Sequence, residues 1–276
     1  MKIGVKVGPA LEREALARAA REAERAGFDS IWLSERVVTP LDRPHPYQPM
    51  VDPWIGLAFC AAVTERVSLG TSVSQIALRH PVLMARELAT LDRLSDGRLI
   101  VGAGAGWVKE EFTSTDVPFD DRGGRLSEHI RAMRHLWTQP ETPFEGKYYR
   151  IPPAGITPPL TAGGPPIYLG AVLPPGFRRA AKYGDGFIAT NVKPADLATS
   201  VSRLAALREK YGRAGDFAIF VQTSPPATVD DARALVESYA SAGATGLILT
   251  YDTPVPDAFL TAANVTEALL TTARDA

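Results

Sequence analysis

A run of small residues ends in a tryptophan, Gly102-Ala103-Gly104-Ala105-Gly106-Trp107, and follows an apolar stretch of the chain. Glycines after a strand are typical of dinucleotide-binding turns, but this run lies mid-chain and lacks the G-x-G-x-x-G spacing. Two interpretations remain open. The small side chains allow close packing, or they leave room for a flat ring system with Trp107 beside it.

Other residue types that carry chemistry lack the spacing that their chemistry requires. Cys60 lies in an apolar helical pattern, where a buried and inert thiol is expected, and no G-x-S-x-G nucleophile motif occurs. Glu110 and Glu111 are adjacent, so their side chains are expected to diverge rather than act as a hydrolytic pair. No metal site is expected, because the four histidines lack HExxH or other ligand spacing: His45, His80, His129 and His135.

Strand-like and helix-like segments alternate along almost the whole chain. Short runs rich in valine, isoleucine, leucine and phenylalanine occur at 3–7, 28–33, 66–73, 98–103, 166–171, 186–190, 217–222 and 246–251. Strands that are apolar throughout are typical of a parallel sheet buried on both faces. An open doubly wound sheet shows the same alternation, but eight strand–helix units favour a closed barrel. We therefore predict an α/β protein, a (β/α)₈ TIM barrel that forms a single domain over residues 1–276.

The segment 138–165 interrupts this alternation. It is rich in proline, threonine and glycine, and its stretch Phe144-Glu145-Gly146-Lys147-Tyr148-Tyr149 is typical of a small hairpin. We predict that the segment is an insertion between the fourth helix and the fifth strand.

In barrels of this kind the active site lies at the C-terminal ends of the strands, where the loops converge. That rule selects the residues that follow the predicted strands. They are Ser34, Glu35 and Arg36; Ser72 and Val73; Gly104, Gly106 and Trp107; Gly170, Ala171 and Val172; Thr190 and Asn191; Gln222; and Tyr251.

Composition excludes several other classes of protein. Hydrophobic residues make up 45% and charged residues 22% of the chain, which is typical of a packed globular core. The net charge is −1 with no basic stripe, so neither nucleic acid nor an anionic membrane surface is expected as a partner. One cysteine, Cys60, excludes an internal disulfide framework. The N-terminal residues are typical of a strand rather than a signal peptide, and no run reaches the roughly 18 apolar residues of a spanning helix, so a cytoplasmic location is expected.

Several motifs in order resemble the bacterial luciferase-like family, and most of all its deazaflavin-dependent branch. They are Thr71-Ser72-Val73, Leu78-Arg79-His80-Pro81, the stretch Leu91 to Leu99, Gly102 to Trp107, Glu111-Phe112, Arg122-Gly123, Pro166 to Gly170 and Ala181 to Phe187. The stretch Leu91 to Leu99 is expected to be structural, ending the third helix and leading into the fourth strand. One such motif would be weak, whereas the ordered set is specific.

The resemblance implies a barrel that binds a flavin or deazaflavin at its C-terminal mouth. In the family a non-proline cis peptide lies behind the central ring, and this maps to Ser72-Val73. The phosphate of the cofactor would meet backbone amides of the segment Gly170 to Gly176, at the start of the following helix. Arg178 and Arg179 would assist there, or else they are ordinary solvated helix residues.

The chain also departs from one member of the family, a sugar-phosphate dehydrogenase. That related enzyme has an Asp-His pair where this chain has Glu35-Arg36, and a glutamate where this chain has Trp107. Thr190 and Lys193 do fall where it holds the phosphate of its substrate. Because the proposed base and acid of that enzyme are both absent from this chain, we do not expect the same activity.

The function implied is hydride transfer between coenzyme F420 and a small organic substrate. Glu35 would orient the ring or manage the proton, or it forms a salt bridge to Arg36 or another residue of the mouth. Trp107, His45 and Tyr251 are candidates for the pocket wall. The alternatives are an FMN-dependent monooxygenase that uses reduced flavin and oxygen, and a non-catalytic ligand-binding barrel. The family also implies a homodimer, to which the stretch Trp54 to Phe59 and the helix from Pro81 are candidates to contribute.

Overall fold

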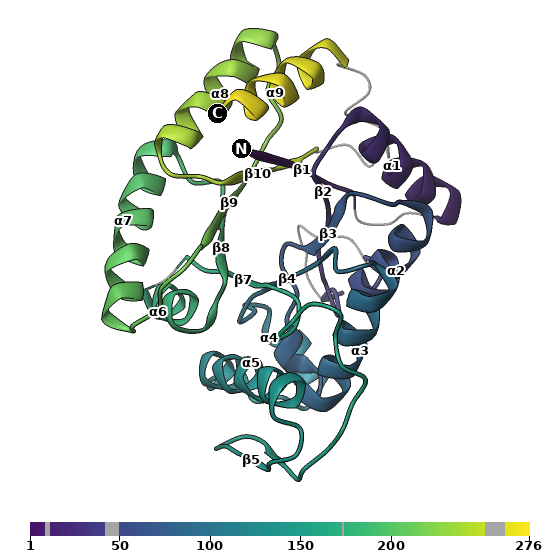
Figure 1. Cartoon of the computed structure of the whole chain (residues 1–276), viewed down its shortest axis with the longest axis vertical. Helices are drawn as coiled ribbons and strands as arrows, with labels where there is room; N and C mark the ends of the chain where they lie inside the picture. Colours follow the sequence, from purple (N-terminus) through teal and green to yellow (C-terminus); the bar gives the residue numbers. More distant parts are fainter. Residues whose placement is uncertain (9–11, 42–49, 173, 252–262) are drawn as a thin grey trace.

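Eight parallel strands close into a barrel in the order β1-β10-β9-β8-β7-β4-β3-β2, and helices surround it (Figure 1). The structure is a computed structural model that describes residues 1–8, 12–41, 50–172, 174–251 and 263–276. The closed barrel confirms the predicted fold, because an open sheet would leave β1 and β10 unpaired with each other.

The elements follow the predicted alternation with small shifts at their ends. The barrel strands are β1 Lys2–Lys6, β2 Ser30–Leu33, β3 Ser68–Thr71, β4 Leu99–Ala103, β7 Ile167–Gly170, β8 Gly186–Thr190, β9 Ala218–Thr223 and β10 Gly246–Thr250. The helices are α1 Arg13–Ala26, α2 Pro53–Val63, α3 Pro81–Leu94, α4 Lys109–Thr113, α5 Arg122–Thr138, α6 Pro174–Tyr183, α7 Pro194–Lys210, α8 Val229–Ser241 and α9 Ala263–Asp275, with a 3₁₀ turn η1 at Ile76–Leu78. The short α4 and η1 were not predicted. None of the described helices is both long and apolar enough to cross a membrane.

The inside of the barrel is filled at mid-height by its own side chains. Trp32, Ile188, Phe220 and Ile248 form a buried cluster there, separate from the larger core between strands and helices. Gly70 makes room for this cluster, because a Cβ at that position would lie 2.4 Å from the Trp32 ring. A ligand therefore cannot pass through the barrel, and a site has to lie at one of its ends.

The stretch from Leu91 to Leu99 is structural, as expected. Asp92 is fully buried and accepts hydrogen bonds from the backbone N–H and the hydroxyl of Thr161, at 2.7 and 2.9 Å. Gly97 has a φ of 75°, in the left-handed region that glycine adopts most readily after a helix. Arg98 then donates to the carbonyl oxygens of Thr64 and Val67, which joins the start of β4 to the segment before β3.

The insertion carries the predicted hairpin. Strand β5 Phe144–Glu145 pairs with β6 Arg150–Ile151, so the second strand begins just beyond the predicted stretch. Glu128 of α5 accepts hydrogen bonds from the backbone N–H groups of Lys147, Tyr148 and Tyr149, which attaches the hairpin to that helix. Helix α5 extends to Thr138, so the irregular segment begins immediately after it.

Acid should destabilise the fold through His129, which is fully buried in α5 beside Tyr149. Burial, together with the charges of His80 and Arg125, lowers its pKa from 6.5 to about 3. Between these values the unfolded chain binds a proton that the folded chain does not, so stability is lost as pH falls through that window, by about 1.4 kcal/mol per pH unit.

Urea unfolding at several pH values between 7 and 4 measures this loss. We expect the variant His129→Gln, which keeps a polar partner for the Tyr149 hydroxyl, to lose stability less steeply than the natural chain. Equal slopes for the two proteins would show that this histidine does not titrate with unfolding.

Candidate active site

The peptide bond between Ser72 and Val73 is cis, as the resemblance implied, and it lies directly after β3. The Val73 side chain packs on the inner cluster of the barrel. A Cβ on Gly104 would lie 2.7 Å from its Cγ2, and a Cβ on Gly170 would lie 3.1 Å from its Cγ1. The glycines that follow β4 and end β7 therefore pack closely against the methyl groups of Val73 and form an apolar surface with it. That they leave room for a flat ring stays a prediction.

Hydrogen bonds between β2, β3 and β4 hold this surface in place. The Ser34 hydroxyl donates to the carbonyl oxygen of Ser72 at 2.9 Å. The Ser74 N–H donates to the carbonyl oxygen of Gly102 at 2.8 Å, and the Gly104 N–H donates back to Ser74 at 2.9 Å. Ser34, Ser72, Val73 and Gly104, all predicted to bind the cofactor, thus form one connected structure at the mouth.

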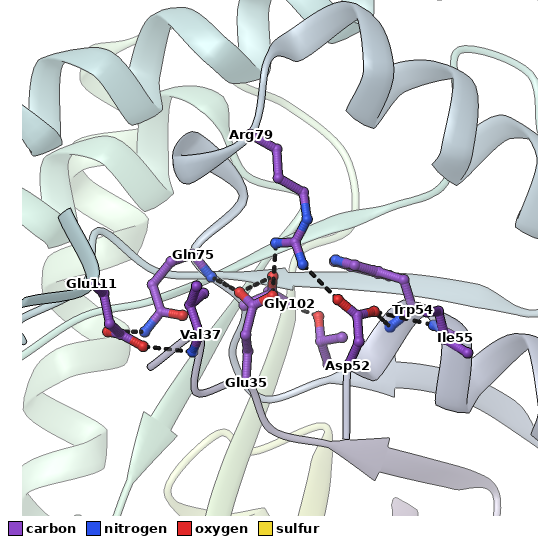
Figure 2. Close-up of polar contacts among 11 residues, drawn as sticks. Glu35, Val37, Asp52, Trp54, Ile55, Gln75, Arg79, Gly102 and Glu111 are labelled. Atoms are coloured by element: carbon purple, nitrogen blue, oxygen red, sulfur yellow. Dashed lines mark hydrogen bonds and ion pairs between the residues drawn. The ribbon is translucent and has the colours of Figure 1, made fainter. Parts of the chain in front are cut away.

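Glu35 is buried beside that structure and accepts three hydrogen bonds. The Ser74 hydroxyl, the Gln75 backbone N–H and Nη1 of Arg79 each donate to its carboxylate at 2.7 Å (Figure 2). Arg79 also donates to Asp52 at 2.7 Å, which caps the N-terminus of α2. The salt bridge to another residue of the mouth is thereby confirmed, with Arg79 rather than Arg36 as the partner. The catalytic role of Glu35 stays a prediction.

Arg36 instead pairs with Glu111 of α4, and both side chains are almost fully buried. The Arg36 Nη1 donates to Glu111 at 2.8 Å. The same carboxylate accepts from the Val37 N–H and from the Gln75 side chain (Figure 2). Burial raises the pKa of Glu111, although Arg36 and the Val37 N–H act against this. Gln75 therefore joins the two carboxylates, with its N–H on Glu35 and its side chain on Glu111.

Trp107 lies on the open side of the mouth, and 59% of it is exposed. The Arg36 guanidinium lies 5.3 Å from the centre of its ring. Gly106 has a φ of 77°, and a Cβ there would lie 2.8 Å from the Phe112 ring, so glycine is required for the turn that presents the tryptophan. The role of Trp107 as a pocket wall stays a prediction.

The start of α6, where the phosphate site is predicted, lies close to the end of β7. A Cβ on Gly176 would lie 2.2 Å from the Cβ of Ala171, so the glycine lets the helix approach the end of β7 closely. Val172 is 85% exposed, which leaves the segment open to a ligand. Arg178 is exposed to solvent, whereas Arg179 is partly buried.

Two arginines lie close together between α5 and α6. Arg179 donates to the carbonyl oxygen of Gly123 at 3.0 Å and to the Ser127 hydroxyl at 3.1 Å. Arg122 donates to the carbonyl oxygens of Gly106 and Phe119. Burial, and then the charge of Arg122, lower the pKa of Arg179. Within the described ranges no ion pair joins either guanidinium to a carboxylate, so a negative ligand would relieve their repulsion.

Lys6 is a residue of the mouth that sequence reasoning missed. It pairs in register with Trp32 of β2 and Thr250 of β10, so its side chain points to the inside of the barrel, as that of Trp32 does. The signal was present in the chain, because Lys6 alternates with the apolar residues Val5 and Val7.

Lys6 lines a cavity of about 150 Å³ at the ends of β1, β2 and β10. The cavity is bordered by Val7, Gly8, Leu33, Ser34, Met50, Val51, Thr250 and Tyr251. Burial lowers the pKa of Lys6 to about 8 and raises that of Tyr251 to about 12. Ser34 and Tyr251, selected from the sequence as mouth residues, therefore meet around a lysine.

Two further predicted substrate residues, Thr190 and Lys193, lie on the far side of the mouth. Thr190 is exposed at the end of β8, and Lys193 precedes α7 at its N-cap position. Neither lines the cavity around Lys6. His45 lies outside the described residues. Among the residues that are described, no group of three or more histidine, cysteine or acidic side chains is placed to hold a metal ion. Cys60 is fully buried, and burial raises the pKa of its thiol to about 12, as expected for an inert cysteine.

Comparison with known proteins assigns a family to this arrangement. The family model described as luciferase-like monooxygenase matches residues 2–270. An F420-dependent glucose-6-phosphate dehydrogenase of Nakamurella multipartita is 37% identical over 208 residues, which are 72% of this chain and 58% of the relative. The chain therefore spans less than two thirds of the length of that enzyme.

Two solved structures share the fold over almost their whole length. One is an F420-dependent secondary alcohol dehydrogenase in complex with an F420–acetone adduct, with a TM-score of 0.85, 18% identity, and 99% of both chains covered. The other is the monooxygenase RslO1 from Streptomyces bottropensis, with a TM-score of 0.82, 21% identity, and 99% of this chain and 98% of that chain covered. At such identities the likeness concerns the fold alone.

Proposed function

The chain belongs to the luciferase-like monooxygenase family, and from this premise we propose that it is an oxidoreductase that transfers a hydride between coenzyme F420 and a small organic substrate. The coarser description, a luciferase-like oxidoreductase, follows from the family. The choice of F420 is supported by the 37% identity to a dehydrogenase that is named for this cofactor. The observation that carries the proposal is the apolar surface of Val73 between Gly104 and Gly170.

The residues at the mouth fit a flat cofactor. The two glycines place no side chain over the Val73 methyl groups that they contact, and the hydrogen-bonded segment Ser72 to Ser74 holds the valine in place. When bound, F420 supplies a carbon that accepts or releases a hydride, and the protein supplies position and charge. Ser34 would act by fixing the carbonyl group of Ser72, while Trp107 would cover the ring from the solvent side.

Backbone amides at Ala171, Val172 and Gly176 would hold the phosphate of the cofactor, with Arg122 and Arg179 supplying positive charge. We expect Arg179→Gln to weaken F420 binding about tenfold, because one charge-assisted hydrogen bond contributes on the order of 1.5 kcal/mol or more. The loss should shrink as salt is raised. The matched control is Lys182→Gln, which removes an exposed positive charge from the same helix. Equal affinities for the two variants in a fluorescence titration would remove Arg179 from the site.

Glu35 tests the catalytic part of the proposal. We expect Glu35→Gln to reduce kcat at least tenfold while the Kd for F420 changes little, because the amide keeps the shape of the side chain but not its charge. Asp52→Asn is the control, since it removes the other carboxylate that contacts Arg79 without touching Ser74 or Gln75. A kcat that is lowered equally in both variants would assign the effect to Arg79, and an unchanged kcat would end the catalytic role of Glu35.

Titration of the purified protein with F420 and, separately, with FMN tests the cofactor. We expect quenching of protein fluorescence by F420 at micromolar concentration or below, with FMN weaker by at least tenfold. Selective binding of FMN would instead favour the monooxygenase, for which the shared fold of RslO1 is a precedent. Binding of neither would favour a non-catalytic barrel, and both results would overturn the proposal.

We also propose that the protein forms a homodimer through α2 and α3. Ile55 of α2 and Leu83 of α3 are 74% and 53% exposed, while the neighbouring Trp54 and Leu57 are buried in the core. Sedimentation equilibrium of the natural chain and of Ile55→Glu measures this, with a monomeric natural chain as the contrary result.

A further inference from the structure

Lys6 carries a charge that the described part of the molecule does not balance. Its side chain lies on the inner face of the barrel, in register with Trp32 and Thr250. No hydrogen bond or ion pair joins its Nζ to another residue in the described ranges, and burial alone accounts for its lowered pKa. A partly buried ammonium group without an anion is costly, so such a position is typical of a site that receives one.

The carboxylates that follow β2 and precede α2 are already engaged. On the β2 and α2 side, Glu35 and Asp52 are both held by Arg79. On the β10 side the titratable group is Tyr251, whose pKa of about 12 keeps it neutral at physiological pH. The side chains of β1 that flank Lys6 are apolar, and Ser34 is a neutral hydroxyl. Within the described residues, Lys6 is thus the charged group of its cavity near neutral pH.

The cavity also limits the size and character of its ligand. It has a volume of about 150 Å³ and is lined by the apolar side chains of Val7, Leu33 and Val51 as well as by hydroxyls. An apolar cavity of roughly this volume accepts a benzene-sized molecule. One cation among apolar side chains matches a ligand with a small hydrocarbon body and a single negative group.

We propose that this cavity binds a small organic carboxylate, with the Lys6 ammonium group as the anchor of the carboxylate and the apolar side chains around its hydrocarbon part. That the ligand is the substrate of the enzyme rests on the proposed function, whereas its binding does not. The cavity lies at the ends of β1, β2 and β10, and the surface of Val73 lies between β3, β4 and β7. Substrate and cofactor would therefore enter the same mouth from different strands.

Calorimetric titration with benzoate as the probe, without added cofactor, tests the site. We expect benzoate to bind in the millimolar range or tighter at pH 7, and benzamide, its neutral counterpart of the same size, to bind at least about tenfold more weakly. Lys6→Met should weaken benzoate binding by a similar factor. The control is Lys2→Met, which makes the same change in the same strand at the opposite end, where Lys2 pairs with Asp29.

The pH dependence gives a second readout. Because the amine loses its charge as pH rises through about 8, and loss of that charge is expected to weaken binding about tenfold, benzoate should bind about sevenfold more weakly at pH 9.5 than at pH 7. Lys6→Met should bind weakly at both values. Circular dichroism and thermal unfolding of each variant show whether it is folded. If Lys6→Met is not folded, Lys6→Arg, which keeps the charge, is used in its place.

The outcomes separate this inference from the proposed function. Benzoate binding that depends on Lys6, in a protein that binds no F420, would support the carboxylate site and end the proposed function. F420 binding without benzoate binding would end the carboxylate site alone. A Lys6→Met variant that loses F420 instead of benzoate would show that the lysine holds the cofactor, which also overturns the inference.

Discussion

Replacing Gly170 by leucine is expected to abolish detectable F420 binding while the barrel remains folded. Gly170 ends β7 and pairs in register with Ile188, so a side chain there points to the inside of the barrel mouth. A Cβ would lie 3.1 Å from Val73, which a small shift of the valine accommodates. The additional atoms of leucine would occupy the surface that the ring requires. We expect a loss of at least about 100-fold in affinity, or roughly 2.7 kcal/mol.

A series of substitutions makes this prediction specific. Gly170→Ala should weaken F420 binding slightly, Gly170→Val further and Gly170→Leu most, with similar thermal unfolding temperatures throughout. Gly155→Leu is the control, because a Cβ there meets nothing within 4 Å. Fluorescence titration measures each affinity. Undiminished F420 binding by a folded Gly170→Leu protein would place the cofactor elsewhere.

Replacing Arg79 by methionine is expected to destabilise the protein by about 3 kcal/mol, because it leaves the buried carboxylate of Glu35 without its cation. The Glu35 side chain is 2% exposed, whereas Asp52, the other partner of Arg79, is 37% exposed and contributes little through this pair. The loss should appear as a lower urea midpoint in equilibrium unfolding. The slope of the free energy of unfolding against urea concentration should not change.

A double-mutant cycle identifies the cause of that loss. If the cost comes from the uncompensated Glu35 charge, Arg79→Met combined with Glu35→Gln should be less destabilised than the sum of the two single variants. Arg79→Lys keeps the charge and should lose less than the methionine variant. Additive effects in the cycle would mean that the packing of the arginine, rather than its ion pair, stabilises the fold.

The sequence by itself determined the architecture, and it predicted the end of the barrel at which the candidate site lies. Each of the eight strands lies within or beside a predicted apolar run. Strand formation and burial on both faces depend on residues that are neighbours in the sequence, so a local pattern predicts them. The order of motifs then located the cis peptide at Ser72-Val73 and the glycines at 104 and 170. These features are local, since they depend on residue types within a short stretch of chain.

The partners of the charged residues were decided by the tertiary structure alone. Glu35 pairs with Arg79, 44 residues away, and Arg36 with Glu111, 75 residues away. The choice depends on how β2, β3 and α4 meet at the mouth, and no local pattern records that geometry.

The orientation of Lys6 was likewise decided by the tertiary structure. Its alternation with Val5 and Val7 was visible in the sequence, but period two gives two faces without stating which one is inside. The pairing of β1 with β2 and β10 turns Lys6 toward the inside of the barrel, and the ends of the three strands enclose the cavity around it. Closure of the sheet, a contact between the two ends of the chain, therefore made a lysine in a strand into a candidate ligand-binding residue.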